Sequence, residues 1–486
     1  MNREFRRVSI VMVAMFLTLF VSTTIIQGIQ ADSLAADSRN TRTLYDSYQT
    51  ERGAILAGDT VLASSKPTGD QFVYQREYPQ GEMYAAVTGY FNPTQGSSGL
   101  EHSMNQYLSG TSNSQFLDTL NQIIAGQDPK GAAVEVTINP AVQEAAWNAM
   151  KGYTGGLVAM EPKTGRILAM VTTPTYDPNA LAEHNSATVL ERYNSLLDEP
   201  SKPLYNRAIS GDQNPPGSTF KVVVAAAAFA SGDYTPDSKL PNPASYTPPG
   251  TSSKIYNATR GTCGPGDEVT IADAIRLSCN IPMAELGVKL GDEAILDTAE
   301  AFGFNDENIT IPLQCGTSNY PQVGLDDAQT ALSAFGQGDV RSTPLQMAMV
   351  SSGIANEGTV MQPTLVDRVT GRNLEVLQSF TPSVYNEATT PDVAADVSGA
   401  MQLSVRSGAA SNATIDGVSV AGKTGTAENG PDEPYSLWFT GFAPADNPQV
   451  AVAVVIEDGG GKGQSGSGNQ IAAPVAKKVI EAVLNE

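Results

Sequence analysis

The chain has 486 residues and a hydrophobic fraction of 41%, which is enough for a large core and excludes wholesale disorder. It carries 29 basic against 51 acidic residues, and a net charge of −22 argues against nucleic acid as a partner, because phosphate binding needs a basic stripe. Only two histidines occur, His102 and His184, which argues against a histidine-rich metal site and restricts any Ser-His-Asp triad to one of them. We therefore expect neither a metal nor an organic cofactor.

The first expected element is a membrane anchor. The uncharged run 8–26 is 19 residues long, just enough to cross a hydrocarbon layer of ~30 Å at ~1.5 Å per helical residue. Arg3, Arg6 and Arg7 precede it, and positive residues favour a cytoplasmic N-terminus. A cleaved signal peptide is the alternative, but residues 28–31, which follow the apolar run, match a signal-peptide cleavage site poorly. We expect an uncleaved single-pass anchor in the cell membrane, with the rest of the chain outside it.

Two regions of different texture follow the anchor. Residues 29–150 are polar, acidic and interrupted by Gly, Pro and Ser clusters, which is typical of a modest α+β region. Beyond it, GGLVAMEP (155–162) and RILAMVTTP (166–174) flank a polar turn and predict a hairpin of two buried strands. The run VVVAAAAFA (222–230) is apolar on every face and predicts a helix inside a large core.

The C-terminal part adds three strand-like runs, at 418–428, 436–444 and 449–457, and an amphipathic helical pattern at 471–485. The fold class is therefore α+β: one sheet takes strands from both ends of a long unit, with helices between them. The expected segments are a cytoplasmic N-terminus (1–7), an anchor (8–28), a pedestal (29–150) and a main domain (151–486).

One lysine in the chain has a serine three places before it, in Ser218-Thr219-Phe220-Lys221. On a helix this spacing puts the Ser218 and Lys221 side chains on one face. Pro-Pro-Gly precedes them, so Ser218 is expected at a helix N-terminus, where free N–H groups stabilise negative charge. A lysine held against an apolar helix has a depressed pKa, and its neutral amine can accept a hydroxyl proton. This replaces the histidine that the composition lacks.

A second motif, Ser278-Cys279-Asn280, lies in a helical context sixty residues further on. The hydroxyl of Ser278 suits a proton relay to a leaving amine, and the amide of Asn280 can hold both the lysine and a substrate carbonyl. The tripeptide pattern is common, however, and recurs at 38–40 and 103–105. Only the copy at 278 lies between the other two motifs.

The third motif is Lys423-Thr424-Gly425-Thr426, which lies in the strand-like run at 418–428. Its lysine presents a positive charge suited to a substrate carboxylate, and Gly425 lets a substrate backbone approach the strand. The N–H of Thr426, paired with that of the serine nucleophile, is a candidate oxyanion hole. A second K-T-G at 163–165 falls between two apolar runs, where we expect only a hairpin turn.

The three cysteines show no zinc spacing and allow three pairings. Cys263 lies in a Gly/Pro loop sixteen residues before Cys279, and we favour a disulfide between these two, which leaves Cys315 over. Three buried, reduced thiols are the alternative.

Three weak motifs in a fixed order form a strong joint signal. Because it carries these three motifs in this order, the chain resembles the class B penicillin-binding proteins. Within that class it is similar to the short actinobacterial penicillin-binding protein A type. The likeness covers essentially the whole chain. The segments that carry it are 206–221, 335–338, 343–348, 423–428 and 438–444, and upstream 51–57 and 101–110.

The resemblance implies the penicillin-binding/serine β-lactamase-like fold: a five-stranded antiparallel sheet flanked by helices, with an N-terminal α+β pedestal. It also implies a D,D-transpeptidase, which is acylated by a D-alanyl-D-alanine stem peptide, releases the terminal D-alanine and passes the acyl group to a neighbouring stem. β-Lactams acylate the same serine. The implied roles are nucleophile for Ser218, general base for Lys221, relay and positioning for Ser278 and Asn280, and carboxylate binding for Lys423, Thr424 and Thr426.

Several alternatives stay open at this point. A D,D-carboxypeptidase would use the same residues with water as acceptor, and a non-catalytic β-lactam sensor would be acylated without turnover. A β-lactamase is disfavoured, because no E-x-x-L-N follows Ser278 and the anchor would be unexplained. The pedestal is either a spacer or a docking site for division or elongation proteins. One departure from the related β-lactamases is Cys279, where they have Asp.

Overall fold

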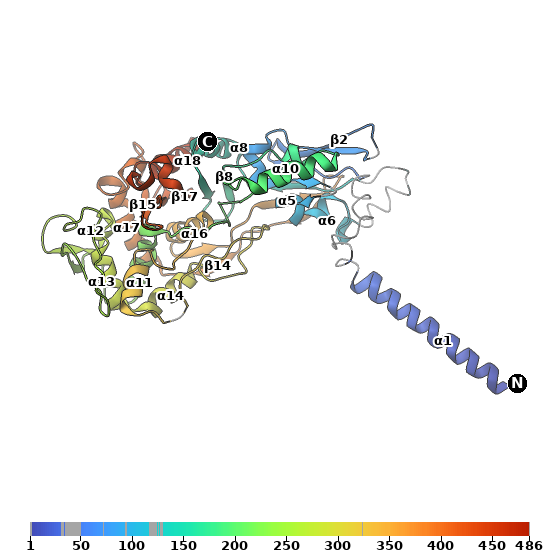
Figure 1. The fold of residues 1–486 in the computed structure, drawn as a ribbon, viewed down its shortest axis with the longest axis horizontal. Coiled ribbons are helices and arrows are strands. Elements are labelled where there is room, and N and C mark those ends of the chain that lie inside the picture. The colour runs from blue at the N-terminus through green and yellow to red at the C-terminus, as the bar shows by residue number, and fades with distance from the viewer. Residues whose placement is uncertain are drawn as a thin grey trace.

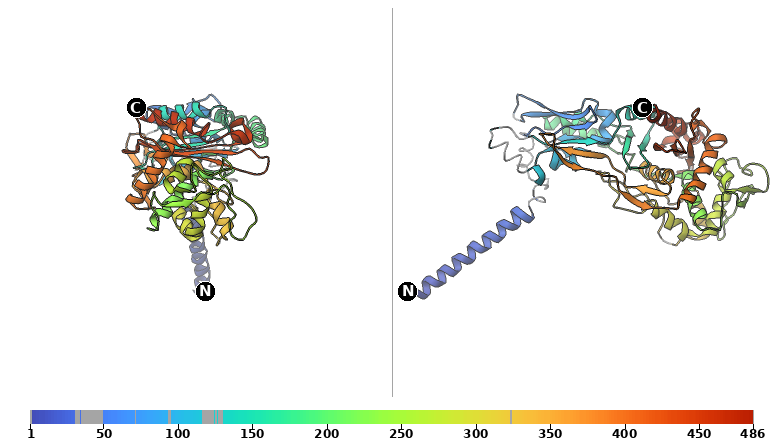
Figure 2. Two further views of the ribbon diagram at one scale, coloured as in Figure 1. Left: turned by 90° about the vertical axis from the view of Figure 1, so that its left-hand side faces the viewer. Right: turned by 180° about the vertical axis from the view of Figure 1, so that it is seen from behind.

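The computed structural model describes residues 2–30, 34, 50–70, 72–92, 95–115, 124, 126, 130–322 and 324–485. Helix α1 (Asn2–Thr24) continues into one π turn (Ile25–Ile29) and projects away from the body in every view (Figures 1 and 2). The stretch Arg3–Gly28 is long and apolar enough to cross a membrane, and none of its most apolar window is buried in the molecule. The anchor expected at 8–28 falls within this stretch.

A five-stranded antiparallel sheet forms the centre of the larger domain, in the order β15-β16-β17-β7-β8. Its strands are β7 (Gly155–Met160), β8 (Ile167–Thr173), β15 (Ala421–Ala427), β16 (Ser436–Ala443) and β17 (Val450–Ile456). The β7–β8 hairpin joins the C-terminal strands through β17, where Gly155 lies opposite Ile456. The predicted hairpin, the three late strands and the sheet built from both ends of the domain are all confirmed.

Helices cover both faces of this sheet, which is why β7, β16 and β17 are buried along their whole length. Alternate residues of β17 face opposite sides. Val452 and Val454 pack against α18 (Ala472–Leu484) and α8 (Pro140–Met150), whereas Ala451 and Ala453 pack in the other core cluster with α16 (Pro344–Ala355) and α11 (Lys221–Ala230). As predicted, α11 is buried on all sides over most of its length.

Most of the remaining helices and hairpins surround this core at the end of the molecule far from α1, whereas the first two in the chain lie beside the pedestal (Figure 1). These remaining elements are α9 (Pro178–Ala182), α10 (Ser186–Asp198), α12 (Ile271–Leu277), α13 (Ile281–Leu290), α14 (Asp292–Ala301), α15 (Asp327–Ser333), α17 (Pro391–Ser407), β9 (Lys239–Pro241), β10 (Glu268–Thr270), β11 (Thr359–Met361) and β14 (Val384–Glu387).

The pedestal lies between α1 and the larger domain (Figure 2). Its main sheet has the order β13-β12-β6-β1-β2-β3. The strands are β1 (Ile55–Ala57), β2 (Thr60–Pro67), β3 (Tyr74–Glu77), β6 (Ala133–Val136), β12 (Val366–Thr370) and β13 (Val376–Ser379). Around it lie α4 (Gly81–Thr88), β4 (Phe91–Asn92), β5 (Gly96–Ser97), α5 (Gly99–Ser103) and α6 (Asn105–Leu108).

Contacts cross the boundary expected at residue 150. Strands β12 and β13 come from deep within the later part of the chain, yet β12 pairs with β6 in the pedestal sheet. Conversely, α8 lies within the range expected for the pedestal and packs on β8 and α18 of the larger domain. Local composition could not show this, because strand pairing over more than 200 residues depends on tertiary contacts.

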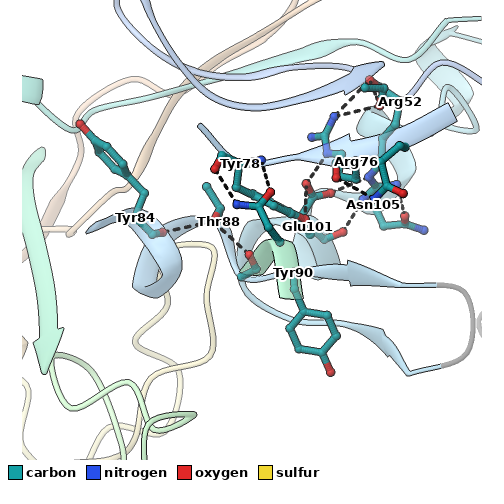
Figure 3. A network of polar contacts seen from close by, with 12 residues as sticks. Arg52, Arg76, Tyr78, Tyr84, Thr88, Tyr90, Glu101 and Asn105 are labelled. Carbon is teal, nitrogen blue, oxygen red and sulfur yellow. Dashed lines mark hydrogen bonds and ion pairs between the residues drawn. The ribbon is translucent and has the colours of Figure 1, made fainter. Parts of the chain in front are cut away.

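A buried charge network holds the pedestal together (Figure 3). The Glu101 carboxylate accepts hydrogen bonds from Arg52 Nε at 2.5 Å, Arg76 Nε at 2.6 Å and the Tyr78 hydroxyl at 3.2 Å. Asn105 Oδ1 accepts from Arg52 at 2.7 Å. Burial by itself raises the pKa of Glu101, but the guanidinium groups of Arg76 and Arg52 outweigh it, and the net pKa lies below its ordinary value.

We expect Glu101→Gln to lower the free energy of unfolding by about 3–5 kcal/mol, because it leaves two buried guanidinium groups without their counter-charge. Denaturant unfolding of the full chain in detergent measures this. Glu135→Gln is the matched control: its bidentate pair with Arg368 joins β6 and β12 of the pedestal sheet but is partly exposed, so the loss there should stay below about 1 kcal/mol. Equal losses in the two variants would refute the structural role of Glu101.

Candidate active site

The turn that carries Ser218 is held in a tight glycine contact. A short 3-10 turn (Gly217–Phe220) leads directly into α11. The N–H of Gly217 donates to the carbonyl of Gly336 at 3.0 Å, and a Cβ on Gly336 would lie 2.1 Å from the carbonyl oxygen of Gly217. The 335–338 segment thus supports the turn from behind. Ser218 is 8% exposed and lies at the start of a buried helix.

Lys221 is fully buried, and its amine has two defined partners. Nζ donates to the carbonyl oxygen of Ser278 at 2.9 Å and to Asn280 Oδ1 at 2.8 Å. Burial lowers the pKa of Lys221 well below its ordinary value, and the charge of Lys423 lowers it further. A neutral amine has two N–H groups and one lone pair. Because both partners are carbonyl acceptors, they take the N–H groups and leave the lone pair for a third group.

Ser278 lies between the two lysines. It ends α12 in the left-handed conformation, with φ 63°, an uncommon backbone state for a non-glycine residue. Its carbonyl accepts from Lys221, while its Oγ accepts from Lys423 Nζ at 2.8 Å. One residue therefore links both amines, through its backbone on one side and its side chain on the other.

Lys423 lies on β15, the edge strand of the central sheet. It is fully buried, and burial lowers its pKa to about 7. Thr424 Oγ1 donates to the carbonyl of Ala409 at 2.9 Å, and the side chain of Thr426 accepts from the N–H of Gly468 at 3.2 Å.

Gly425 provides the direct contact between β15 and the serine turn. A Cβ at this position would lie 2.7 Å from the carbonyl oxygen of Pro216. The edge strand therefore packs against the turn that precedes Ser218, and a larger residue at 425 would push the two apart. In this way the fold brings all eight expected residues of the three motifs to one place, although they span more than 200 positions in the chain.

The copies of the motifs at 103–105 and 163–165 lie elsewhere in the structure. Lys163 is in the turn of the β7–β8 hairpin, as predicted, and donates to Asn447 at 3.3 Å. Asn105 belongs to the pedestal charge network. The copy at 38–40 lies outside the described residues. Among the described residues, no three His, Cys, Asp or Glu side chains gather as metal ligands would.

Cys263 and Cys279 form a disulfide, the pair favoured by the sequence, with their Cα atoms 5.6 Å apart. Cys315 is a free thiol, and burial raises its pKa to about 12. The disulfide thus ties the Ser278–Asn280 motif to the preceding loop.

One residue of this region, Asn257, is not predicted by any sequence pattern. It lies in the loop before the disulfide, and its Oδ1 accepts from the N–H groups of Asn280 at 2.9 Å and Ile281 at 3.1 Å. A single asparagine in a polar loop cannot be distinguished from a turn residue by pattern alone, because its partners are 23 and 24 residues away.

The fold and this group of residues are those of a serine acyl-transfer enzyme in which lysine replaces histidine. The family model described as "Penicillin binding protein transpeptidase domain" matches residues 155–481, and that of the "Penicillin binding protein A dimerisation domain" matches 52–134. The chain belongs to the penicillin-binding protein transpeptidase family.

Named relatives agree with this assignment. The chain is 40% identical to the peptidoglycan D,D-transpeptidase PbpA of Mycolicibacterium smegmatis, over 100% of both chains, and 39% identical to that of Mycobacterium tuberculosis, over 100% of this chain and 99% of the other. The crystal structure of penicillin-binding protein A from M. tuberculosis as a ceftriaxone acyl-enzyme matches with a TM-score of 0.87 and 38% identity, over 90% of this chain and 100% of the other.

We expect the double variant Cys263→Ser/Cys279→Ser to lower the free energy of unfolding by about 3 kcal/mol, because a bond that closes a 16-residue loop restricts the unfolded chain. Denaturant unfolding with and without a reductant measures the loss. Cys315→Ala, which touches no disulfide, should respond to the reductant as the wild type does. Identical midpoints for oxidised and reduced wild-type protein would contradict the expectation.

Proposed function

We propose that this D,D-transpeptidase cross-links peptidoglycan stem peptides through an acyl-enzyme on Ser218. The observation that carries the assignment is the bonding of Lys221. Both of its N–H groups face carbonyl acceptors, which leaves the lone pair of a neutral amine for the serine one turn earlier.

In the acylation step, Ser218 Oγ attacks the carbonyl of the penultimate D-alanine while its proton passes to Lys221 Nζ. The N–H groups of Ser218 and Thr426 receive the oxyanion that forms. When the peptide bond breaks, the proton held on Lys221 Nζ passes through the hydroxyl of Ser278 to the leaving amine of the terminal D-alanine, and Lys221 becomes neutral again. An ester to Ser218 and free D-alanine are the products.

The second step reverses this sequence with a new amine. An amino group of a neighbouring stem attacks the ester carbonyl and gives up its proton toward Lys221 through the same groups, and Ser218 Oγ leaves as the hydroxyl. A new peptide bond between the two stems results, and the enzyme returns to its starting state. Asn280 keeps the Lys221 amine in place throughout, through the bond to its Oδ1.

Lys423, Thr424 and Thr426 are assigned to the substrate carboxylate. The bond from Lys423 Nζ to Ser278 Oγ places this cation next to the proton relay. A bound carboxylate would stabilise the ammonium form, since opposite charges in a buried site favour each other. β-Lactams carry a carboxylate of the same kind and are proposed to acylate Ser218 in this chain as well.

The orientation in the membrane follows from charge. Arg3, Arg6 and Arg7 precede the apolar stretch, and we assign them to the cytoplasmic side. The pedestal and the catalytic domain then lie outside the membrane, where stem peptides are found. Whether the pedestal also binds division or elongation proteins is a separate proposal, for which its place between α1 and the catalytic domain is the support.

The decisive experiment offers the full-length protein a stem-peptide mimic together with a D-amino-acid acceptor and identifies the products by mass spectrometry. We expect the exchanged peptide. Released D-alanine without exchange would instead indicate the carboxypeptidase, and a stable penicillin adduct with no peptide product would indicate the sensor.

Ser218→Ala should abolish covalent labelling by a fluorescent penicillin, because it removes the atom that forms the ester. Lys221→Ala should reduce labelling nearly as far while the protein stays folded, since a neutral base contributes roughly 10²–10⁴-fold. Labelling is read on a gel and folding by thermal unfolding. Intact labelling of Ser218→Ala would refute the nucleophile, and near-normal labelling of Lys221→Ala would refute the base.

Lys423 predicts a pH limit on acylation. Its pKa of about 7 means that the ammonium form is lost as the pH rises through that value, so the second-order rate of penicillin acylation should fall on the alkaline side. Lys423→Ala should lower the acylation rate and remove its decrease at alkaline pH. Lys163→Ala, in the second K-T-G, is the matched control and should leave the whole profile unchanged. A wild-type profile that is flat from about pH 6 to 9 would contradict the role of Lys423.

A further inference from the structure

Helix α13 (Ile281–Leu290) has an unusual start. Its N-cap residue is Asn280, a residue type that normally caps a helix by accepting a hydrogen bond from the second or third N–H. The Asn280 side chain makes no such bond. Instead, its Oδ1 accepts from Lys221 Nζ at 2.8 Å and its Nδ2 donates to the carbonyl of Tyr256 at 3.0 Å.

Another asparagine satisfies the donors at this helix end. Oδ1 of Asn257 accepts from the N–H of Asn280 at 2.9 Å and from that of Ile281 at 3.1 Å. Pro282, the second helical residue, has no N–H, so one of the two donors that an Asn280 cap would reach does not exist. Asn257 is 3% exposed, and its Nδ2 donates to the carbonyl of Gly261 at 2.9 Å. Its carboxamide is therefore held at both ends.

We propose that Asn257 is a positioning residue for acyl transfer: it accepts from the first two N–H groups at the start of helix α13 and so fixes the backbone from which the Asn280 carboxamide holds Lys221. The neighbouring carbonyl of Tyr256 completes the arrangement. It takes the Nδ2 of Asn280, which turns Oδ1 toward the Lys221 amine. The inference rests on the proposed function, because it assumes that Lys221 must be held for the chemistry.

The segment that carries Asn257 is fastened to the helix pair around the motif. At one end, Ile255 packs in a small cluster with Ile281 and Phe335. At the other end, Cys263 is bonded to Cys279. Asn242 fixes that end further, accepting from the N–H of Cys263 at 2.8 Å and donating to its carbonyl at 3.1 Å. Asn257 therefore reaches α13 from a support that is itself tied to the motif.

Removal of the Asn257 side chain has a specific expected consequence. The N–H groups of Asn280 and Ile281 lose their acceptor, and buried donors without a partner are costly. The start of α13 is then no longer anchored to the loop, so the backbone of Asn280 can shift. If it shifts, Asn280 Oδ1 moves away from Lys221 Nζ, and the amine loses one of its two acceptors.

The test is a double-mutant cycle on the full-length protein in detergent, read as the second-order rate of acylation by a fluorescent penicillin. We expect Asn257→Ala to slow acylation by roughly tenfold or more, the scale of one lost hydrogen bond in the transition state. In an Asn280→Ala background the same change should cost little more, because the group through which Asn257 acts is gone. Asn257→Asp, which keeps the acceptor, should recover most of the rate.

Asn139→Ala is the matched control. Oδ1 of Asn139 also accepts from two successive N–H groups, those of Ala141 at 2.9 Å and Val142 at 3.2 Å, at the start of α8. It should lower the thermal midpoint in the same manner as Asn257→Ala but leave acylation unchanged. If Asn257→Ala fails to fold, the same double-mutant cycle is measured with Asn257→Ser, whose side chain is a shorter hydrogen-bond acceptor.

Two results would overturn the inference: an unchanged acylation rate in Asn257→Ala, or the same fold-loss with and without Asn280. Either can occur while wild-type protein is acylated at Ser218 and exchanges stem peptides, in which case the proposed function stands and only the role of Asn257 fails. If wild-type protein is not acylated at all, the proposed function fails first.

Discussion

A buried lysine amine with both N–H groups taken by carbonyls is the constraint on which this active site depends. Desolvation inside an apolar core is what lowers the pKa of Lys221 well below its ordinary value, and it can act only if the surrounding packing excludes water. The two acceptors, the Ser278 carbonyl and Asn280 Oδ1, then fix the direction of the amine. A histidine would need neither condition, since its ordinary pKa already lies near neutrality.

The rest of the catalytic domain supplies those conditions. Helix α11 is buried among α12, α13, α14 and α17, so the lysine at its start is removed from solvent. The edge strand β15 lies against the serine turn through Gly425, and Gly336 supports the same turn from the other side. Small residues occur where backbones must approach each other, which lets separate chain segments form one compact site.

The loop before Cys279 and the pedestal are also held in place by specific contacts, although they lie further from the reacting groups. Asn257 satisfies the start of α13, and the disulfide holds its loop to the motif. In the pedestal, Glu101 balances two buried arginines, and β12 and β13 join the pedestal sheet from the later part of the chain. The catalytic domain and its support are thus linked by strand pairing as well as by chain connectivity.

Local pattern alone determined the membrane-spanning stretch, the β7–β8 hairpin, the buried helix α11, the three late strands and the three motifs with Ser218, Lys221 and Lys423. Apolar periodicity and short spacing are properties of neighbouring residues, so they can be read from the sequence. Only the tertiary structure decided that β12 completes the pedestal sheet, that α8 packs on the catalytic domain and that Asn257 accepts from the first two N–H groups at the start of α13. Those contacts join positions far apart in the chain, and their energies arise from burial and from hydrogen-bond partners that no local pattern contains.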